Sequence, residues 1–370
     1  MLAVEIFFWA SAGLLVYTHV GYPLLLWLVA RRRTAWPETA ELPRVSLIVA
    51  AYDEDAVIAG KVENVRALDY PRDRLELIVA SDGSSDRTVE IAQEAGADLV
   101  LDLPRGGKIR AQDQAVERAS GDIAAFSDAN SFWEPGALRE LVKPFADPEV
   151  GYVCGQVRFV NEAGSNQEGV YWRYEMAVRA LESRLRGVTG GNGAIYATRK
   201  EAYMVVDPRM GHDLSFPFNM VKRGWRPVYA PDARASERMV PSIEGEFARK
   251  RRMMSHAWPI VLRGGLLSPR GYGPAYAWEI ASHRVLRYAS PFLHLAALGT
   301  NIALLGGVYW VTFALQAAFL LAALLGPFVP ARMFRLPYYY VLVTASIAAG
   351  LWDWIRTGTA AGWEKAEGTR

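Results

Sequence analysis

The sequence contains a single cysteine, Cys154, so the chain cannot form an internal disulfide. Stable domains without disulfides suit a reducing compartment, and we therefore predict that the folded part of the chain lies in the cytoplasm. Basic and acidic residues nearly balance, with 41 Lys and Arg against 39 Asp and Glu and a net charge of +2. Because nucleic-acid binding needs a strongly basic surface, no nucleic-acid partner is predicted.

Two common phosphate-binding motifs are also missing. No G-x-G-x-x-G follows the first strand-like segment, 45–51, which argues against a bound dinucleotide. Gly106-Gly107-Lys108 lacks the earlier glycine that a P-loop requires, which removes the simplest ATPase interpretation. The glycine- and arginine-rich turn expected of a nucleotidyltransferase on a similar sheet is absent as well.

Charged residues are absent from several long stretches, which predicts membrane helices. Residues 6–30 contain no Asp, Glu, Lys or Arg and would form a helix of about 37 Å, enough to cross a hydrocarbon layer of about 30 Å. No basic region precedes this stretch and no cleavage site follows it, so we predict an uncleaved transmembrane anchor over residues 1–30. Arg31, Arg32 and Arg33 place the residues that follow on the cytoplasmic side.

A second uncharged stretch, 288–331, is long enough for two more crossings, with a pair of glycines near the turn. Residues 337–352 would make a further span. Before them, 263–288 mixes aromatic residues with arginine, a composition typical of segments in the membrane interface. We therefore predict four transmembrane helices, one N-terminal and three C-terminal, the latter within residues 289–355.

Between the membrane segments the hydrophobic pattern becomes that of a soluble α/β domain. Apolar runs of strand length alternate with helix-like segments four times, beginning at Val45. Such alternation predicts a doubly wound, Rossmann-like sheet with helices on both faces. One expected helix, 84–95, would take Ser84 or Ser85 as its N-cap. In the second half the loops lengthen but the apolar segments continue, so we treat residues 44–262 as one domain.

Polar residues follow three of the predicted strands at the point where each strand ends. They are Tyr52-Asp53-Glu54, Ser81-Asp82-Gly83-Ser84-Ser85-Asp86 and Asp128-Ala129-Asn130. In α/β sheets ligands bind outside the carboxyl ends of the strands, so the three clusters are expected to share one edge. Asp128 and Asn130 are two residues apart, and in extended backbone both would offer oxygens to the same divalent cation. Taken alone, any one of these aspartates is more simply explained as turn chemistry.

The polar motifs of the whole chain resemble those of a known enzyme family. In order they are Tyr52-Asp53-Glu54, Ser81-Asp82-Gly83-Ser84-Ser85-Asp86, Asp128-Ala129-Asn130, Gly191-Asn192-Gly193, His212-Asp213 and Arg249-Lys250-Arg251-Arg252. This order and rough spacing resemble the family 2 glycosyltransferases, in the membrane-bound branch that includes cellulose and hyaluronan synthases and bacterial exopolysaccharide transferases. The resemblance covers the whole soluble domain and implies a GT-A-type fold for it.

The resemblance also implies a role for each motif. The donor nucleotide, of a UDP-sugar in the first place, would be bound by Tyr52, Glu54, Asp82, Lys108 and Asp128. A divalent metal, Mg or Mn, would be held by Asp128 and Asn130. The general base would be Asp213, and the diphosphate would be bound by Arg249, Lys250 and Arg252. The acceptor would be contacted by Gly191, Asn192, Gly193 and Trp258.

Three positions depart from the family pattern. Asn130 stands where the family usually has an aspartate, and a neutral carboxamide is a weaker metal ligand. His212 replaces the acid that usually precedes the catalytic aspartate. Met253 stands where processive synthases carry a tryptophan, which favours the addition of one or a few sugars over a long polymer.

We therefore expect an inverting glycosyltransferase that is integral to a bacterial inner membrane and surrounded by membrane lipid. It would move sugar from a nucleotide-sugar donor to a lipid-linked or growing polysaccharide acceptor during the synthesis of cell-surface polysaccharide. Two alternatives stay open. One is a processive synthase that also translocates its polymer, and the other is a catalytically inactive membrane assembly partner.

Overall fold

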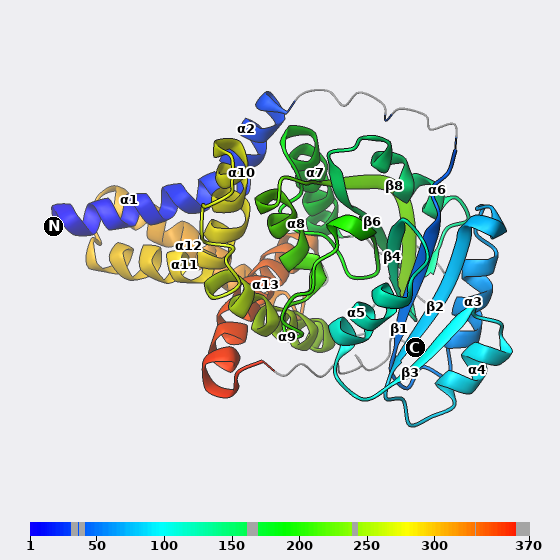
Figure 1. Ribbon diagram of the computed structural model, residues 1–370. Coiled ribbons are helices and arrows are strands. Elements are labelled where there is room, and N and C mark those ends of the chain that lie inside the picture. Colours follow the sequence, from blue (N-terminus) through cyan, green and yellow to red (C-terminus); the bar gives the residue numbers. More distant parts are fainter. Residues whose placement is uncertain (31–35, 37–40, 161–168, 239–242, 330, 360–370) are drawn as a thin grey trace. The chain divides into compact units, whose positions relative to one another are not determined.

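The computed structural model describes residues 1–30, 36, 41–160, 169–238, 243–329 and 331–359 (Figure 1). The chain forms two compact units. The sheet unit comprises Val29–Pro241, Pro259–Ala277 and Thr359–Arg370, and the helical unit comprises Met1–Leu28, Ser242–Trp258 and Trp278–Gly358. Ser242–Trp258, which lies inside the domain expected over 44–262, therefore groups with the helices.

An eight-stranded mixed sheet forms the centre of the sheet unit, with the strand order β3-β2-β1-β4-β7-β6-β8-β5. The strands that pair in parallel in its first half are β1 (Val45–Ala51), β2 (Leu75–Asp82), β3 (Leu99–Leu103) and β4 (Ile123–Asp128). Every residue of β1 is buried, as expected for a strand that is covered on both faces. The register pairs Ala51 with Ser81 and Ala50 with Asp128, so β1, β2 and β4 end at the same edge.

Helices cover both faces of these strands. α3 (Ile58–Arg66) and α4 (Thr88–Glu94) lie on one side, and α5 (Lys108–Arg118) lies on the other (Figure 1). The side chains of β1 alternate between the two faces, because Leu47 belongs to the core beneath α3 and Ile48 to the core beneath α5. The predicted α/β class with helices on both faces is confirmed.

The second half of the sheet is mixed, which differs from the all-parallel arrangement that a doubly wound pattern suggests. Its strands are β5 (Phe132–Trp133), β6 (Val150–Val160), β7 (Ile195–Arg199) and β8 (Arg226–Arg238). Its helices are α6 (Ala137–Val142), α7 (Val170–Leu185) and α8 (His212–Lys222), with short 3-10 turns at Arg72–Arg74, Lys143–Ala146 and Lys200–Ala202 in the unit. β7 runs antiparallel to β4, with Ile195 opposite Ser127. The residues before β7 therefore reach the edge at which β4 ends.

One expected helix cap is wrong. α4 begins at Thr88 with Arg87 as its N-cap residue, so neither Ser84 nor Ser85 caps it. The N–H of Thr88 is instead bonded to Oδ1 of Asp86 at 3.0 Å. The two serines belong to the loop that follows β2, where they bond to the neighbouring loop.

Within the described ranges, two helices are long and apolar enough to cross a membrane, Leu2–Val29 and Val308–Leu325. The helices and helical turns outside the sheet unit's core are α1 (Leu2–Val16), a π-helical turn (Tyr17–Gly21), α2 (Tyr22–Val29), α9 (Ile243–Leu262), α10 (Pro274–Glu279), a second π-helical turn (Ile280–Val285), α11 (Leu286–Ala303), α12 (Val308–Leu325) and α13 (Arg332–Thr357). α11 and α13 do form helices where spans were expected. Four transmembrane helices are not confirmed, because α11 and α13 carry more polar and charged side chains than the two helices that qualify.

Polar contacts join the helices of the helical unit. Asn301 of α11 accepts hydrogen bonds from Thr312 at 2.9 Å and Gln316 at 2.6 Å, both of α12. Gly307, with a φ of 50°, lies in the turn between these two helices, as the pair of glycines predicts. Arg251 of α9 forms a bidentate pair with Asp353 of α13, with both distances at 2.6 Å.

Candidate functional site

The carboxyl ends of three parallel strands bring predicted donor residues to one edge of the sheet. Tyr52 follows β1, Asp82 is the last residue of β2, and Asp128 is the last residue of β4. The strands themselves are buried, whereas Tyr52 and Asp128 at this edge are partly exposed. It is also the edge at which α/β sheets bind their ligands.

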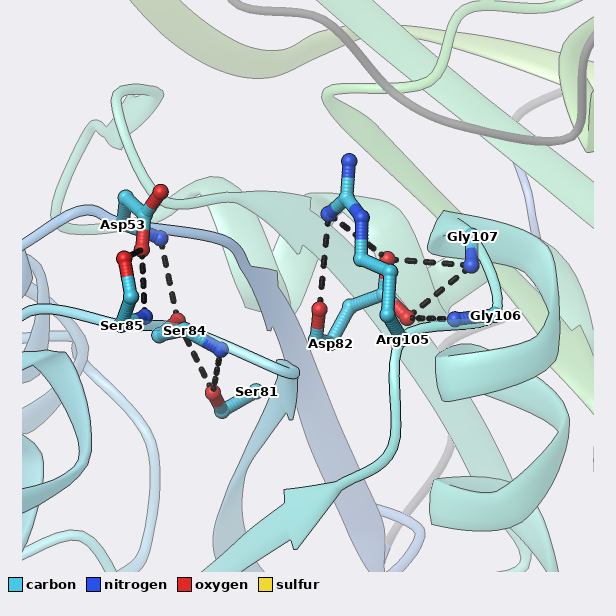
Figure 2. Close-up of polar contacts among 8 residues, drawn as sticks. All are labelled: Asp53, Ser81, Asp82, Ser84, Ser85, Arg105, Gly106 and Gly107. Atoms are coloured by element: carbon cyan, nitrogen blue, oxygen red, sulfur yellow. Dashed lines mark hydrogen bonds and ion pairs between the residues drawn. The ribbon is translucent and has the colours of Figure 1, made fainter.

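The loops after β1 and β2 are bonded to each other (Figure 2). The N–H of Asp53 donates to Oγ of Ser84 at 3.0 Å, and the N–H of Ser85 donates to Oδ1 of Asp53 at 2.7 Å. Ser81 bonds to Ser84 between their hydroxyls at 2.9 Å. Asp53 has a φ of 48°, a left-handed conformation that aspartate tolerates better than most residues. These bonds fix the residue before Asp53, Tyr52, relative to the end of β2.

Glu54 is buried, with 1% of its surface exposed, although the resemblance assigns it to the donor. Its N–H donates to Oγ1 of Thr88 at 2.7 Å, which ties the loop to the start of α4. Asp82 is equally buried, and the donor role assigned to Glu54 stays a prediction.

Asp82 receives several hydrogen bonds from the loop that follows β3. Its Oδ1 accepts the N–H of Gly106 at 2.7 Å and that of Gly107 at 2.9 Å, and its Oδ2 accepts Nη1 of Arg105 at 3.0 Å (Figure 2). Gly107 has a φ of 94°, which favours glycine at the position just before α5. The carboxylate, only 1% exposed, thus orients the start of α5.

Arg105 also covers Tyr52. The Cζ atom of its guanidinium lies 3.3 Å from the centroid of the tyrosine ring, a close cation–π contact. No sequence pattern indicates a role for Arg105, because an isolated arginine in a loop between a strand and a helix matches no motif. Only the fold brings it onto the two residues that the resemblance assigns to the donor.

Lys108, the first residue of α5, forms an ion pair with Oδ1 of Asp128. Both side chains are mostly buried, with 19% exposed in each, so solvent screens the pair only in part. Lys108 also faces the glycine loop, since a Cβ on Gly193 would lie 3.4 Å from its Nζ. The structure therefore joins the predicted donor lysine, the predicted metal ligand and the predicted acceptor loop.

Asp128 and Asn130 are suitable ligands for a divalent cation. Among the described residues, no three His, Cys, Asp or Glu side chains gather as a metal site. Magnesium and manganese sites that act on nucleotides do not need such a group, because they use one or two protein oxygens together with phosphate oxygens and water. Ala129 and Asn130 form a turn, in which the N–H of Ser131 donates to the main-chain oxygen of Asp128 at 3.2 Å, and not the extended backbone considered from the sequence. Oδ1 of Asp128 pairs with the ammonium of Lys108, and a carboxylate has a second oxygen that can accept a cation, so the donor set fits.

Lys61 lies beneath the turn that carries these ligands. Its side chain is fully buried in α3, its ammonium donates to the main-chain oxygen of Ser131, and it lies 5.4 Å from the ring centroid of Trp133. Burial lowers the pKa of Lys61 to about 7, although the charges of Asp128 and Glu237 oppose that shift. No pattern in the sequence indicates this role, because lysine in an amphipathic helix normally lies on the exposed face.

We predict that Lys61→Met changes how stability depends on pH. Between the folded pKa of about 7 and the unfolded value of 10.5, the unfolded chain binds a proton that the folded protein lacks, so Lys61 favours folding more as the pH rises. Below pH 7 its contribution is constant. The melting temperature of the wild type minus that of the variant should therefore rise by on the order of 5 °C between pH 7 and 10 and stay level between pH 5 and 7.

Thermal melts of the two proteins at matched pH measure this difference. Lys143→Met, at a surface lysine paired with Glu140, is the control and should give a flat difference over both ranges. A flat difference for Lys61→Met would contradict a buried lysine that loses its proton.

The acceptor side of the edge is formed by the glycine loop and the start of α8. The N–H of Gly191 donates to the main-chain oxygen of Asp213 at 2.6 Å. Asn192 holds the loop from within, because it donates to Gly155 at 2.6 Å and accepts the N–H of Ile195 at 2.9 Å. A Cβ on Gly191 would overlap the hydroxyl of Tyr152, so only glycine fits there. The predicted base and the predicted acceptor loop are thus in contact.

Asp213 is the second residue of α8, whose N-cap is Gly211, and its side chain is half-buried. Its neighbour His212 is buried, stacks on Phe216 with ring centroids 3.9 Å apart, and bonds through Nδ1 to the hydroxyl of Tyr196 at 2.8 Å. Burial, together with the charge of Lys108, lowers the pKa of His212 to about 3. His212 is therefore neutral at physiological pH and contributes no charge beside Asp213.

The predicted diphosphate residues and Trp258 belong to the helical unit. Arg249 and Lys250 pair with Glu246 of the same helix, at 2.8 Å and 3.4 Å. Trp258 is buried and donates its indole N–H to the main-chain oxygen of Ile347 at 2.9 Å. The roles assigned to these residues, and to Arg252, stay predictions.

Residues 46–207 match the family model described as Glycosyl transferase family 2. The matched region includes the strand ends and loops that carry Tyr52, Asp82, Lys108 and Asp128. The chain therefore contains a family 2 glycosyltransferase domain over these residues.

Two relatives illustrate the range of the family. Over 168 residues the chain is 34% identical to the beta-monoglucosyldiacylglycerol synthase of Synechocystis sp., which is 42% of this chain and 34% of that protein. Over 235 residues it is 26% identical to the poly-beta-1,6-N-acetyl-D-glucosamine synthase of Staphylococcus aureus, which is 60% of this chain and 57% of that protein. The chain thus spans about a third of the length of the first relative and over half of the second.

A solved structure shares the fold over nearly the whole chain. It is a mannosyltransferase from Pyrobaculum calidifontis in complex with GDP-Man and Mn²⁺, with a TM-score of 0.72 and 23% identity. The similarity covers 94% of this chain and 98% of that chain. The GT-A-like α/β fold is therefore confirmed.

Proposed function

We propose that the chain is an inverting glycosyltransferase of a bacterial inner membrane. It would transfer a sugar from a nucleotide-sugar, a UDP-sugar in the first place, to a lipid-linked or growing polysaccharide acceptor in the synthesis of cell-surface polysaccharide. The observation that carries the proposal is the meeting of two sets of contacts at one sheet edge. Lys108 pairs with Asp128 on the donor side, and the glycine loop that faces Lys108 bonds to Asp213 on the acceptor side.

On the donor side, transfer breaks the bond between the anomeric carbon and the diphosphate, and negative charge develops on the leaving group. Lys108 holds a fixed positive charge where that group would lie, which stabilises the charge without reorganisation. Asp128 and Asn130 would hold a divalent cation, Mg or Mn, which supplies further positive charge to the diphosphate when bound. Tyr52 and Asp82 would bind the nucleoside.

On the acceptor side, the new bond forms between the anomeric carbon and a hydroxyl oxygen of the acceptor. A sugar hydroxyl is a weak nucleophile, so a positioned carboxylate must take its proton as the bond forms. Asp213 is half-buried beside the glycine loop, and its neighbour His212 is neutral, so we assign the role of base to Asp213. A single displacement of this kind inverts the anomeric configuration.

A processive synthase is the second candidate, and the similarity to the staphylococcal poly-beta-1,6-N-acetyl-D-glucosamine synthase is what favours it. Product length on a defined acceptor separates the two candidates. A ladder of products supports the synthase, whereas a single added sugar supports the transferase.

Isothermal titration of the full chain in detergent with UDP, with and without Mn²⁺, tests the proposed function. We expect binding that is much stronger with the metal. GDP is the next ligand to titrate, because the mannosyltransferase of similar fold was solved with GDP-Man. If folded protein bound no nucleoside diphosphate under either condition, the enzymatic proposal would fail and the assembly role would stand.

A further inference from the structure

Arg105 contacts both residues to which the proposed function assigns the nucleobase. Its guanidinium lies over the ring of Tyr52 at 3.3 Å, and its Nη1 donates to Oδ2 of Asp82 at 3.0 Å and to the main-chain oxygen of Asp82 at 3.4 Å. A flat cation that stacks on an aromatic ring and donates N–H groups to a carboxylate has the same recognition chemistry as a nucleobase with a ring N–H.

We propose that Arg105 occupies the nucleobase half of the donor site and that the donor must displace it in order to bind. The inference rests on the proposed function, because it takes Tyr52 and Asp82 as the residues that contact the base. Arg105 is then a residue that sets donor affinity by competing with the donor for a ring face and for one carboxylate oxygen.

The competition follows from how Asp82 is used. Its Oδ1 accepts two main-chain N–H groups, from Gly106 and Gly107, and these come from the loop itself (Figure 2). Oδ2 accepts an N–H of the Arg105 guanidinium at 3.0 Å. The N–H of Gly107 is bifurcated and also reaches Oδ2, at 3.0 Å. A base that donates an N–H to this carboxylate would therefore take the place of Arg105 rather than that of the glycines.

Arg105 can leave without unfolding its loop. Its side chain is 38% exposed, whereas that of Asp82 is 2% exposed, so the arginine has solvent to move into. The loop is held by the two glycine N–H groups and by close packing against Gly83, where a Cβ would lie 2.9 Å from the main-chain nitrogen of Arg105. These restraints involve main-chain atoms, and a change of the Arg105 side chain leaves them in place.

The bound base would also have to replace the two contacts that are lost when Arg105 moves away, the stacking on Tyr52 and the hydrogen bond to Asp82. Uracil and guanine each present a ring N–H beside a carbonyl, so either can restore the bond to Asp82 while stacking on Tyr52. A pyrophosphate has no ring and no N–H donor, so it should bind without displacing Arg105. Comparing nucleotide binding with pyrophosphate binding therefore distinguishes a competition between Arg105 and the base from a contact between Arg105 and the phosphates.

Titration of the full chain in detergent with UDP, GDP and pyrophosphate, each with Mn²⁺, tests the inference in wild type and Arg105→Ala. Removing the competitor should tighten the nucleotide that the wild type binds by about threefold to tenfold, the range expected for a partly exposed cation–π contact. The affinity for pyrophosphate should be unchanged. Arg110→Ala removes the same charge from an exposed position on α5 and is the matched control, with no tightening expected.

Other outcomes overturn the inference. Weaker nucleotide binding in Arg105→Ala would mean that Arg105 contacts the bound donor, and equal binding would mean that it does not compete. A melting temperature close to that of the wild type establishes that the variant is folded. If neither the wild type nor Arg105→Ala bound any diphosphate, the proposed function itself would fail. If the wild type bound the nucleotide and the variant bound it no more tightly, only the inference about Arg105 would fail.

Discussion

Sugar transfer is expected to fall by at least about 100-fold when Asp213 is replaced by asparagine, while nucleotide binding persists. The carboxamide keeps the shape of the carboxylate but cannot take a proton from the acceptor hydroxyl. The local structure should survive, because the contact from the glycine loop is made to the main-chain oxygen of Asp213 and not to its side chain. The loss should therefore appear in the turnover number, with a donor affinity close to that of the wild type.

Transfer of radiolabelled sugar from the nucleotide-sugar to membrane acceptors, with UDP titration of the same preparation, measures both quantities. Asp207→Asn is the matched control, because Asp207 lies shortly before α8 and pairs with Arg209 at 2.6 Å. It makes the same chemical change outside the site and should keep full activity. Retention of transfer in Asp213→Asn would mean that another group accepts the proton.

The same variant addresses the assembly alternative. An assembly partner would need its fold and its surfaces but not the carboxylate of Asp213. If a strain lacking the gene recovered normal surface polysaccharide with Asp213→Asn, the catalytic proposal would be contradicted even though the chain carries a family 2 domain.

The sequence predicts the donor edge well, because the evidence for it is local. Each of β1, β2 and β4 is a mostly apolar run, and polar residues gather where each strand ends, around Tyr52, Asp82 and Asp128. In parallel strands the carboxyl ends must share an edge, so three local signals are enough to predict one site. Strand direction in the second half is not a local property. The reversal of β7, which brings the glycine loop to that edge, depends on a long connection whose path the pattern does not encode.

The residues that sequence reasoning missed act through tertiary contacts. Lys61 lies on a helix whose neighbours Val62 and Val65 predict the buried face, and only the turn after β4 gives its ammonium a partner. Arg105 lies in a loop with no motif, and its contact with Tyr52 spans two strand ends. The misplaced cap of α4 has a similar cause, since Ser84 bonds to the loop after β1 instead of to its own helix.

Metal-dependent nucleotide binding is expected to disappear in Asp128→Ala. Asp128 is the anionic one of the two proposed metal ligands, and the neutral carboxamide of Asn130 has too little charge to hold a divalent cation alone. The variant also removes the carboxylate that pairs with Lys108, which lowers the negative charge facing the diphosphate. Weak binding without metal should therefore persist or increase slightly, while the gain on adding Mn²⁺ is lost.

Titration of UDP at several Mn²⁺ concentrations measures that gain directly. Asp102→Ala, at an exposed aspartate of β3 in the same sheet, is the control and should bind metal and nucleotide like the wild type. A gain with Mn²⁺ that survives in Asp128→Ala would place the metal on other residues. A loss of metal-free binding as well would instead mean that Asp128 is needed to hold Lys108 in position. These two results lead to different conclusions. If the gain with Mn²⁺ survives, Asp128 is not a metal ligand. If metal-free binding is lost, the ion pair between Lys108 and Asp128 is what orders the donor side.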